Sequence, residues 1–189
     1  MSWTPSIAPD AATPALKHVY DRIRARASSQ QVSHIWQAWG AHPAGLEAAF
    51  ATFRTLMDHP EPLTFAQAEM IALVVSATNG CAYCVAHHGP KLARHVGDDL
   101  AQAVAKDYRQ ANLPARDRVL LDMAVAVTCE PAERTQADIE RVREYGFDDV
   151  AIVRAVEIAS FYNSINRMVL ALGVTLERGR DAWEFGSQK

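Results

Sequence analysis

The sequence predicts an all-α protein with one domain, residues 1–189. Apolar residues recur at spacings of three and four along most of the chain, which is typical of amphipathic helices. No segment alternates between apolar and polar residues as a half-buried strand does, and the apolar run 73–75 lies inside a helical period. The chain of 189 residues is 49% hydrophobic, which is ample for one core.

The N-terminal part of the chain is expected to form an arm followed by helices. Residues 1–12 contain prolines and should be extended. Helices are expected within 14–40, because Thr13 can cap free amide groups and Pro14 suits the first helical position. The apolar stripe of the first helix comprises Leu16, Val19, Tyr20 and Ile23. A short helix is expected around 32–39.

The predicted core of the bundle, about residues 43–130, begins with a helix that Pro43 opens. The apolar side of this helix consists of Leu46, Phe50, Phe53 and Met57. Residues 59–62, with two prolines, form a rigid connection. Thr64 and Gln67 then have the spacing of a capping box, which predicts that another helix starts there.

A cysteine-containing helix is expected next. The pair Asn79-Gly80 is a helix-breaking signal, so Cys81 should open a new helix, with the CxxC motif at its N-terminus. This helix should run to about His95 and stop at Gly97.

Four further helices are expected downstream. The acidic residues 98–99 suit the start of one helix, and another follows Pro114. Two C-terminal helices should occupy 135–172, a short one and a long one. Their caps are Thr135 and Asp148. The tail, 174–189, is polar apart from Val174, Leu176, Trp183 and Phe185.

Composition excludes several classes of partner. The net charge of −3 and the absence of a basic run argue against a nucleic acid. No apolar stretch reaches the roughly 18 residues that span a bilayer, so no membrane partner is expected. The N-terminus lacks the basic-then-apolar layout of a signal peptide. We therefore expect a cytoplasmic protein, and in a reducing compartment a close cysteine pair is more often catalytic or metal-binding than structural.

One stretch in the middle of the chain concentrates the reactive residues. Each helical residue turns about 100°, so Cys81, Cys84 and His88 share one face. An imidazole four residues after Cys84 can touch its sulfur, whereas His87 points away from that face. Glu69 is an acid in an otherwise apolar run. The stretch therefore predicts a dithiol with a histidine and a carboxylate in reach.

Two interpretations of the cysteine pair are open. A structural zinc site needs four ligands, and the local candidates are Cys81, Cys84, His87 and His88. On one helix His87 diverges too far for tetrahedral closure, and the sequence has no second CxxC or HxxxH motif. A redox dithiol needs only two sulfurs, a means of forming a thiolate and a proton relay. We expect the redox dithiol, with no metal and no cofactor.

Two influences compete over which sulfur ionises. The helix N-terminus favours a thiolate at Cys81 by roughly 0.3–1 kcal/mol. The imidazole of His88 favours Cys84, and in a desolvated pair it can shift the thiol pKa by several units. In a buried site His88 should prevail and make Cys84 the nucleophile. Cys129 is expected to be a small core residue. The histidines expected at the surface or at caps are His18, His34, His42, His59 and His95.

The order Glu69, eleven residues, Cys81-x-x-Cys84, three residues, His88 resembles the motif of alkylhydroperoxidase-D-like (AhpD-like) proteins. These belong to the carboxymuconolactone decarboxylase superfamily. The surrounding segments resemble the branch described as peroxidase-related. They are Pro43-x-x-Leu46, Ser76-x-x-Asn79-Gly80-Cys81-x-Tyr83-Cys84, His87-His88 and Tyr162-Asn163-Ser164-Ile165-Asn166-Arg167. The likeness covers roughly residues 14–172.

The resemblance implies an AhpD-like helical bundle and a thiol-dependent peroxidase of the alkyl hydroperoxide reductase type. It implies that Cys84 is the peroxidatic cysteine and Cys81 the resolving cysteine. His88 and Glu69 would form the proton relay. The substrate would be a hydroperoxide, and a lipoyl-bearing or thioredoxin-like protein would supply the reducing dithiol.

The sequence departs from this family at Tyr83, where a histidine commonly precedes the second cysteine. Proton delivery can therefore differ, with Tyr83 and His87 expected beside the reacting group. Members that act as the lactone decarboxylase typically lack the CxxC motif, which argues against decarboxylation. The alternatives are a general disulfide oxidoreductase and a redox-sensing oligomer without enzymatic activity.

A homo-oligomer is also expected. The terminal segments carry more aromatic side chains than the surface of a monomer should need, and large exposed apolar patches usually mark interfaces. These side chains are Trp36, Trp39, Trp183 and Phe185. The family resemblance implies a dimer, trimer or hexamer.

Overall fold

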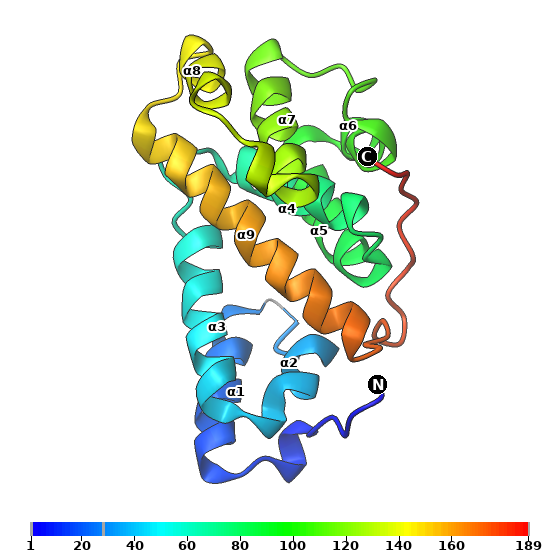
Figure 1. The fold of residues 1–189 in the computed structure, drawn as a ribbon. Helices are drawn as coiled ribbons and strands as arrows, with labels where there is room; N and C mark the ends of the chain where they lie inside the picture. Colours follow the sequence, from blue (N-terminus) through cyan, green and yellow to red (C-terminus); the bar gives the residue numbers. More distant parts are fainter. Residues whose placement is uncertain (1, 28, 189) are drawn as a thin grey trace.

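Helices provide all the regular secondary structure of the described chain. The structure is a computed structural model that describes residues 2–27 and 29–188. Within these ranges it contains nine α-helices, three 3₁₀ turns and no strand (Figure 1). The predicted all-α fold is confirmed.

The N-terminal elements pack around α3 at one end of the molecule (Figure 1). They are η1 (Pro9–Ala11), α1 (Pro14–Arg26), α2 (His34–Ala38), η2 (Trp39–Ala41) and α3 (Pro43–Met57). The turn η1 interrupts the arm that was expected to be extended throughout 1–12. Thr13 accepts a hydrogen bond from the backbone N–H of Leu16 and so caps α1, as predicted.

The centre of the molecule is α4, in which every residue from Gln67 to Thr78 is buried. It packs against α5, α6, α7 and α9. The central helices are α4 (Phe65–Thr78), α5 (Ala82–Val96), α6 (Asp98–Asp107) and α7 (Ala115–Cys129). The capping box predicted at Thr64 and Gln67 is present, with reciprocal hydrogen bonds of 3.1 and 3.0 Å. Because α4 is buried on all sides, any polar side chain on it meets protein rather than water.

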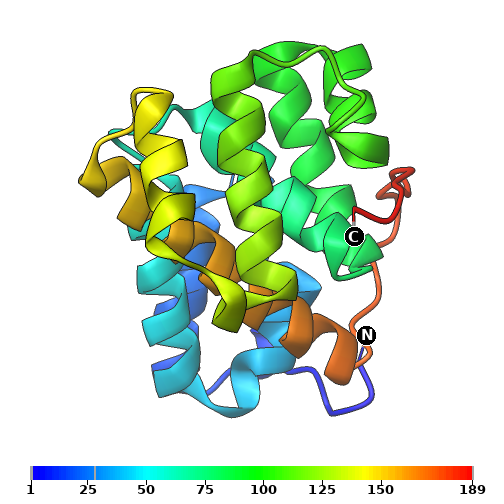
Figure 2. The same cartoon turned by 45° about the horizontal axis from the view of Figure 1, so that its top comes forward.

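The C-terminal elements cover a face of this centre. They are η3 (Pro131–Glu133), α8 (Gln136–Glu144) and α9 (Asp149–Ala171). The long helix α9 crosses the molecule diagonally against α4 (Figure 1), and Figure 2 shows α7 standing across α9 with α8 beside it. Asp148 accepts a hydrogen bond from the backbone N–H of Ala151, which confirms the predicted cap.

The tail after α9 packs along α5 and α6 (Figure 1). The indole of Trp183 lies on Gly89 so closely that a Cβ at that position would meet the ring at 2.6 Å. Gly186 donates a backbone hydrogen bond to the carbonyl of Ala105, and Gln188 is fully buried. Although polar in sequence, the tail is therefore a packed part of the molecule.

Two expectations about burial are wrong, one for Cys129 and one for the terminal aromatic residues. Cys129 is exposed, because it is the last residue of α7, where that helix reaches the surface. Trp36 is only 8% exposed and packs on Phe50 and Phe53, and the other three terminal aromatics are half-buried. The aromatic argument for an oligomer therefore fails. The oligomer remains a prediction that rests on the resemblance.

Among the described residues, no helix has both the length and the apolarity required to cross a lipid bilayer.

Candidate active site

The CxxC motif lies at a sharp turn between α4 and α5. Gly80 has a φ of +68°, a left-handed conformation that glycine adopts without steric cost, and the chain reverses there. The N–H of Cys81 donates to the carbonyl of Ser76, which closes the end of α4. Cys81 is then the N-cap of α5, as predicted, and Cys84 lies in its first turn.

The two thiols are buried and in contact. The Sγ atoms of Cys81 and Cys84 lie 2.7 Å apart and share a hydrogen bond. Cys81 is fully buried and Cys84 is 3% exposed. From α9, the side chain of Asn166 interacts with both thiols and donates a hydrogen bond of 3.1 Å to Ser76. Thus α9 supplies a fully buried amide that polarises the dithiol.

A carboxylate–imidazole pair links α4 to α5 beside the dithiol. The Oε2 atom of Glu69 lies 2.6 Å from Nδ1 of His88, and both residues are less than 9% exposed. An ionised carboxylate accepts the Nδ1 proton, so Nε2 is the basic nitrogen. Among the described residues no hydrogen bond joins His88 to either thiol, although His88 and Cys84 line the same cavity.

Burial and one cation set the ionisation of this pair. Burial and the neighbouring Lys91 lower the pKa of His88 to about 4, against the opposing effect of Glu69. Burial would raise the pKa of Glu69, but Lys91 and His88 outweigh it and the net shift is downward. Glu69 is therefore a carboxylate and His88 a neutral imidazole at neutral pH. In this state His88 can accept a proton.

The two sulfurs have opposite tendencies to ionise. The hydrogen bond shared with Cys84 lowers the pKa of Cys81 despite burial, and the backbone amide of Cys84 adds to this effect. Burial and the contact with Cys81 raise the pKa of Cys84 well above its usual value. These directions favour ionisation of Cys81 over Cys84. This differs from the expectation that His88 would ionise Cys84, because the imidazole is neutral and is not bonded to the thiol.

A small cavity of about 70 Å³ opens in front of Cys84. Its walls are mostly aromatic and aliphatic. The residues that line it are Ser33, Ile35, Trp36, Phe53, Tyr83, Cys84, His87, His88, Lys91, Phe161, Tyr162 and Ile165. Cys84 is part of this wall and Cys81 is not. A molecule in the cavity therefore meets Cys84 first.

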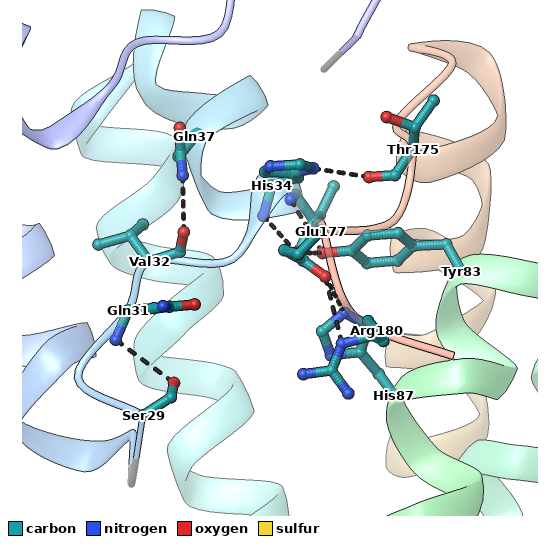
Figure 3. A network of polar contacts seen from close by, with 11 residues as sticks. Ser29, Gln31, Val32, His34, Gln37, Tyr83, His87, Thr175, Glu177 and Arg180 are labelled. Carbon is teal, nitrogen blue, oxygen red and sulfur yellow. Dashed lines mark hydrogen bonds and ion pairs between the residues drawn. The ribbon is translucent and has the colours of Figure 1, made fainter. Parts of the chain in front are cut away.

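The C-terminal tail supplies a second carboxylate, which contacts Tyr83 and His87 of the cavity wall (Figure 3). Glu177 accepts a hydrogen bond of 2.7 Å from the hydroxyl of Tyr83 and one of 2.8 Å from the backbone N–H of His34. Its other oxygen lies 2.9 Å from Nε2 of His87 and 3.3 Å from Nε of Arg180. Although burial opposes it, this set of partners lowers the pKa of Glu177 well below its usual range.

The structure thus brings together the six residues singled out in the sequence. One cavity is lined by Cys84, His88, Tyr83 and His87. Cys81 contacts Cys84, and Glu69 is hydrogen-bonded to His88. Within the described residues, no three or more histidines, cysteines or acids are grouped so that they could hold a metal ion.

Sequence reasoning missed four residues of this site. Asn166 and Tyr162 lie in the segment that resembled the peroxidase-related branch, and a buried amide in an apolar helix could have signalled the first. Lys91 follows the motif by three residues and was not considered in the sequence analysis. Glu177 had no signal, because its tail carries no helical period.

This geometry defines a class of protein. Its members are all-α and have a buried CxxC pair beside a buried glutamate–histidine pair. Residues 44–105 match the model of the Carboxymuconolactone decarboxylase family. The chain is 31% identical to an uncharacterized peroxidase-related protein from Silicibacter sp. TM1040, over 89% of this chain and 90% of that one, with a TM-score of 0.81. This protein belongs to the carboxymuconolactone decarboxylase superfamily and is AhpD-like.

Other solved structures share the fold. An uncharacterized peroxidase-related protein with an AhpD core, from Ralstonia eutropha JMP134, is 29% identical over 96% of this chain and 97% of that one, with a TM-score of 0.85. The debrominase Bmp8 in complex with 2,3,4-tribromopyrrole is 20% identical over 94% and 95% of the two chains, with a TM-score of 0.77. No curated protein matches the chain. The relatives thus support a peroxidase-related role at most.

Proposed function

We propose that this protein is a thiol-dependent peroxidase that reduces a small hydroperoxide with its CxxC dithiol. The observation that carries the proposal is the place of Cys84 in the wall of a cavity, beside His88 and in contact with a second thiol. A peroxidase needs a sulfur that the peroxide can reach, a group that accepts and returns a proton, and a second sulfur that resolves the product. Each of these groups is present.

The first step is attack by Cys84. Nε2 of His88 accepts a proton from the dithiol, and the imidazolium that forms is stabilised by Glu69. As that proton leaves, the sulfur of Cys84 attacks the terminal oxygen of the hydroperoxide, an S–O bond forms and the O–O bond breaks. The leaving alkoxide, or hydroxide, takes the proton from His88. Cys84 becomes a sulfenic acid and the peroxide becomes an alcohol or water.

The second step is resolution by Cys81. Its sulfur, 2.7 Å from that of Cys84, attacks the sulfenic sulfur and displaces hydroxide, which takes the Cys81 proton and leaves as water. The backbone amide of Cys84 also lowers the pKa of Cys81 and does not depend on the oxidation of the Cys84 sulfur, so it favours this attack. The sum is a dithiol and a hydroperoxide converted into a disulfide, an alcohol and water.

A dithiol protein must then reduce the disulfide. Because the two sulfurs are 0% and 3% exposed, the reductant cannot reach them unless the cavity widens. A slender group such as a lipoyl arm needs less opening than a folded protein surface does, and we propose a lipoyl-bearing reductant ahead of a thioredoxin-like one.

The size of the cavity favours a small substrate. The cavity of about 70 Å³ has room for hydrogen peroxide or a short alkyl hydroperoxide.

The proposal is tested by peroxide consumption under a dithiol reductant, with hydrogen peroxide, ethyl hydroperoxide and cumene hydroperoxide compared. Repeated turnover that falls with substrate size supports it. A single stoichiometric oxidation would indicate a redox sensor. Reduction of disulfide substrates without peroxide turnover would indicate a general disulfide oxidoreductase.

A further inference from the structure

The hydroxyl of Tyr162 is buried next to the reacting groups and has no partner. Tyr162 is 1% exposed, and within the described residues its hydroxyl makes no hydrogen bond. Leaving a buried hydroxyl unpaired costs free energy, so native proteins rarely do so without a reason. Other buried tyrosines of this chain obey the rule, since Tyr108 donates to Asp122 at 2.8 Å and Tyr20 to the carbonyl of Ile7 at 2.8 Å.

The position of Tyr162 supplies a reason. It lines the cavity in front of Cys84, and its ring stacks edge-on against the imidazole of His88 with a centroid distance of 4.6 Å. The Glu69 carboxylate and the Cys84 thiol both act electrostatically on its hydroxyl. The ring contacts hold the phenol in place before a ligand arrives.

We propose that Tyr162 is a further catalytic residue, whose hydroxyl donates a hydrogen bond to the leaving oxygen of a hydroperoxide bound in the cavity. This rests on the proposed function and adds a named donor to it. When Cys84 attacks the terminal oxygen and the O–O bond breaks, negative charge develops on the other oxygen. A fixed donor aimed at that charge lowers the barrier, whereas the proton itself still comes from His88.

The phenol remains a donor at every pH at which the dithiol works. Burial, together with the charges of Glu69 and Cys84, raises the pKa of Tyr162 well above its usual value.

Lys91, the cation in the same cavity, interacts with other groups. The ammonium of Lys91 lies 5.7 Å from the centroid of the Phe53 ring and interacts with Glu69.

The test compares Tyr162→Phe with Tyr108→Phe, a buried tyrosine whose hydroxyl is paired and lies outside the cavity. Three quantities are measured: kcat for hydrogen peroxide, the rate at which diamide oxidises the dithiol, and the thermal unfolding midpoint. Diamide closes the disulfide without a leaving oxygen. Tyr162→Phe should lower kcat for peroxide by roughly 100- to 1,000-fold, the range for losing one such donor. Its rate with diamide should not change, and its midpoint should be unchanged or raised.

Tyr108→Phe should show the opposite pattern, with a lower midpoint and an unchanged peroxide rate. Tyr162→Phe with a peroxide rate within twofold of the wild type would overturn the inference and leave the proposed function intact. Equal losses with peroxide and diamide would also overturn it, because the tyrosine would then act on the thiols. So would a lowered midpoint of Tyr162→Phe, which would reveal a structural partner. A wild-type protein that consumes no peroxide would overturn the proposed function and this inference together.

Discussion

The Sγ atoms of Cys81 and Cys84 lie 2.7 Å apart, yet only Cys84 lines the cavity. The pKa of Cys81 is lowered and that of Cys84 is raised, so the more acidic sulfur is the less accessible one. Accessibility and acidity therefore favour different nucleophiles. In our proposal accessibility decides, because the attacking sulfur must touch the peroxide, and the acidity of Cys81 serves the resolving step.

Serine variants of the two cysteines separate these roles. Cys84→Ser should lose all reaction with peroxide, because a serine hydroxyl does not attack an O–O bond at useful rates. Cys81→Ser should react once, and without a resolving thiol its Cys84 should proceed from sulfenic to sulfinic acid. Mass spectrometry after one equivalent of peroxide reads both outcomes. Oxygen adducts on Cys81 in the Cys84→Ser protein, with an inert Cys81→Ser protein, would invert the assignment.

Glu69→Gln tests the proton relay. The amide keeps the shape of the side chain but no longer stabilises the imidazolium of His88, so the fold and the disulfide should survive. Peroxide turnover should fall by roughly 10²- to 10⁴-fold, the range for general acid–base assistance. Glu47→Gln is the matched control, because Glu47 pairs with Arg22 on the surface and should be neutral. Turnover of Glu69→Gln equal to that of the control would rule out the relay.

The Glu177 network predicts that the tail controls access to the thiols. Glu177→Ala removes the acceptor shared by Tyr83, His34 and His87, so the tail should detach more often from the cavity edge. Alkylation of reduced protein by N-ethylmaleimide should then be at least several-fold faster at Cys84. Glu184→Ala is the control, since Glu184 lies on the same tail but its carboxylate pairs with the exposed Lys106, away from the cavity wall. Equal labelling rates in the two variants would show that the tail does not guard the cavity.

The free energy of unfolding should decrease as the pH falls from about 6.5 to about 4, because His88 is buried as a neutral imidazole. Its folded pKa of about 4 lies below the unfolded value near 6.5, so the unfolded state binds more protons between these limits. The contribution of His88 is thus complete above about pH 6.5 and decreases as pH falls toward 4, by roughly 3 kcal/mol in all.

Urea unfolding at pH 7, 5.5 and 4.5 checks this dependence. His87 also has a lowered pKa and acts in the same direction, so His87→Gln is compared with His88→Asn. The slope should remain in His87→Gln and flatten in His88→Asn. A slope that survives in His88→Asn would assign the acid sensitivity elsewhere.

The choice between redox dithiol and zinc site is open to direct measurement. Purified protein should contain well under one zinc per chain, and a chelator should leave its circular dichroism unchanged. Stoichiometric zinc released only on denaturation would favour the structural metal site instead.

Local sequence determined the helices and the spacing of the motif. The Thr64 and Asp148 caps and the break at Gly80 depend on contacts within a few residues, so each could be predicted from neighbours alone. The shared face of Cys81, Cys84 and His88 follows from helical geometry in the same way.

Tertiary structure decided what surrounds that motif. Asn166 and Tyr162 reach the dithiol from α9, and Glu177 is bonded to Tyr83 across 94 positions of the chain. No local pattern encodes such contacts, because they depend on how distant helices pack. The ionisation of the site residues also depends on how distant helices pack. Burial of His88 beside Lys91 leaves its imidazole neutral. Burial of Cys84 and its contact with Cys81 raise the pKa of Cys84 and lower that of Cys81, the reverse of what the motif predicted.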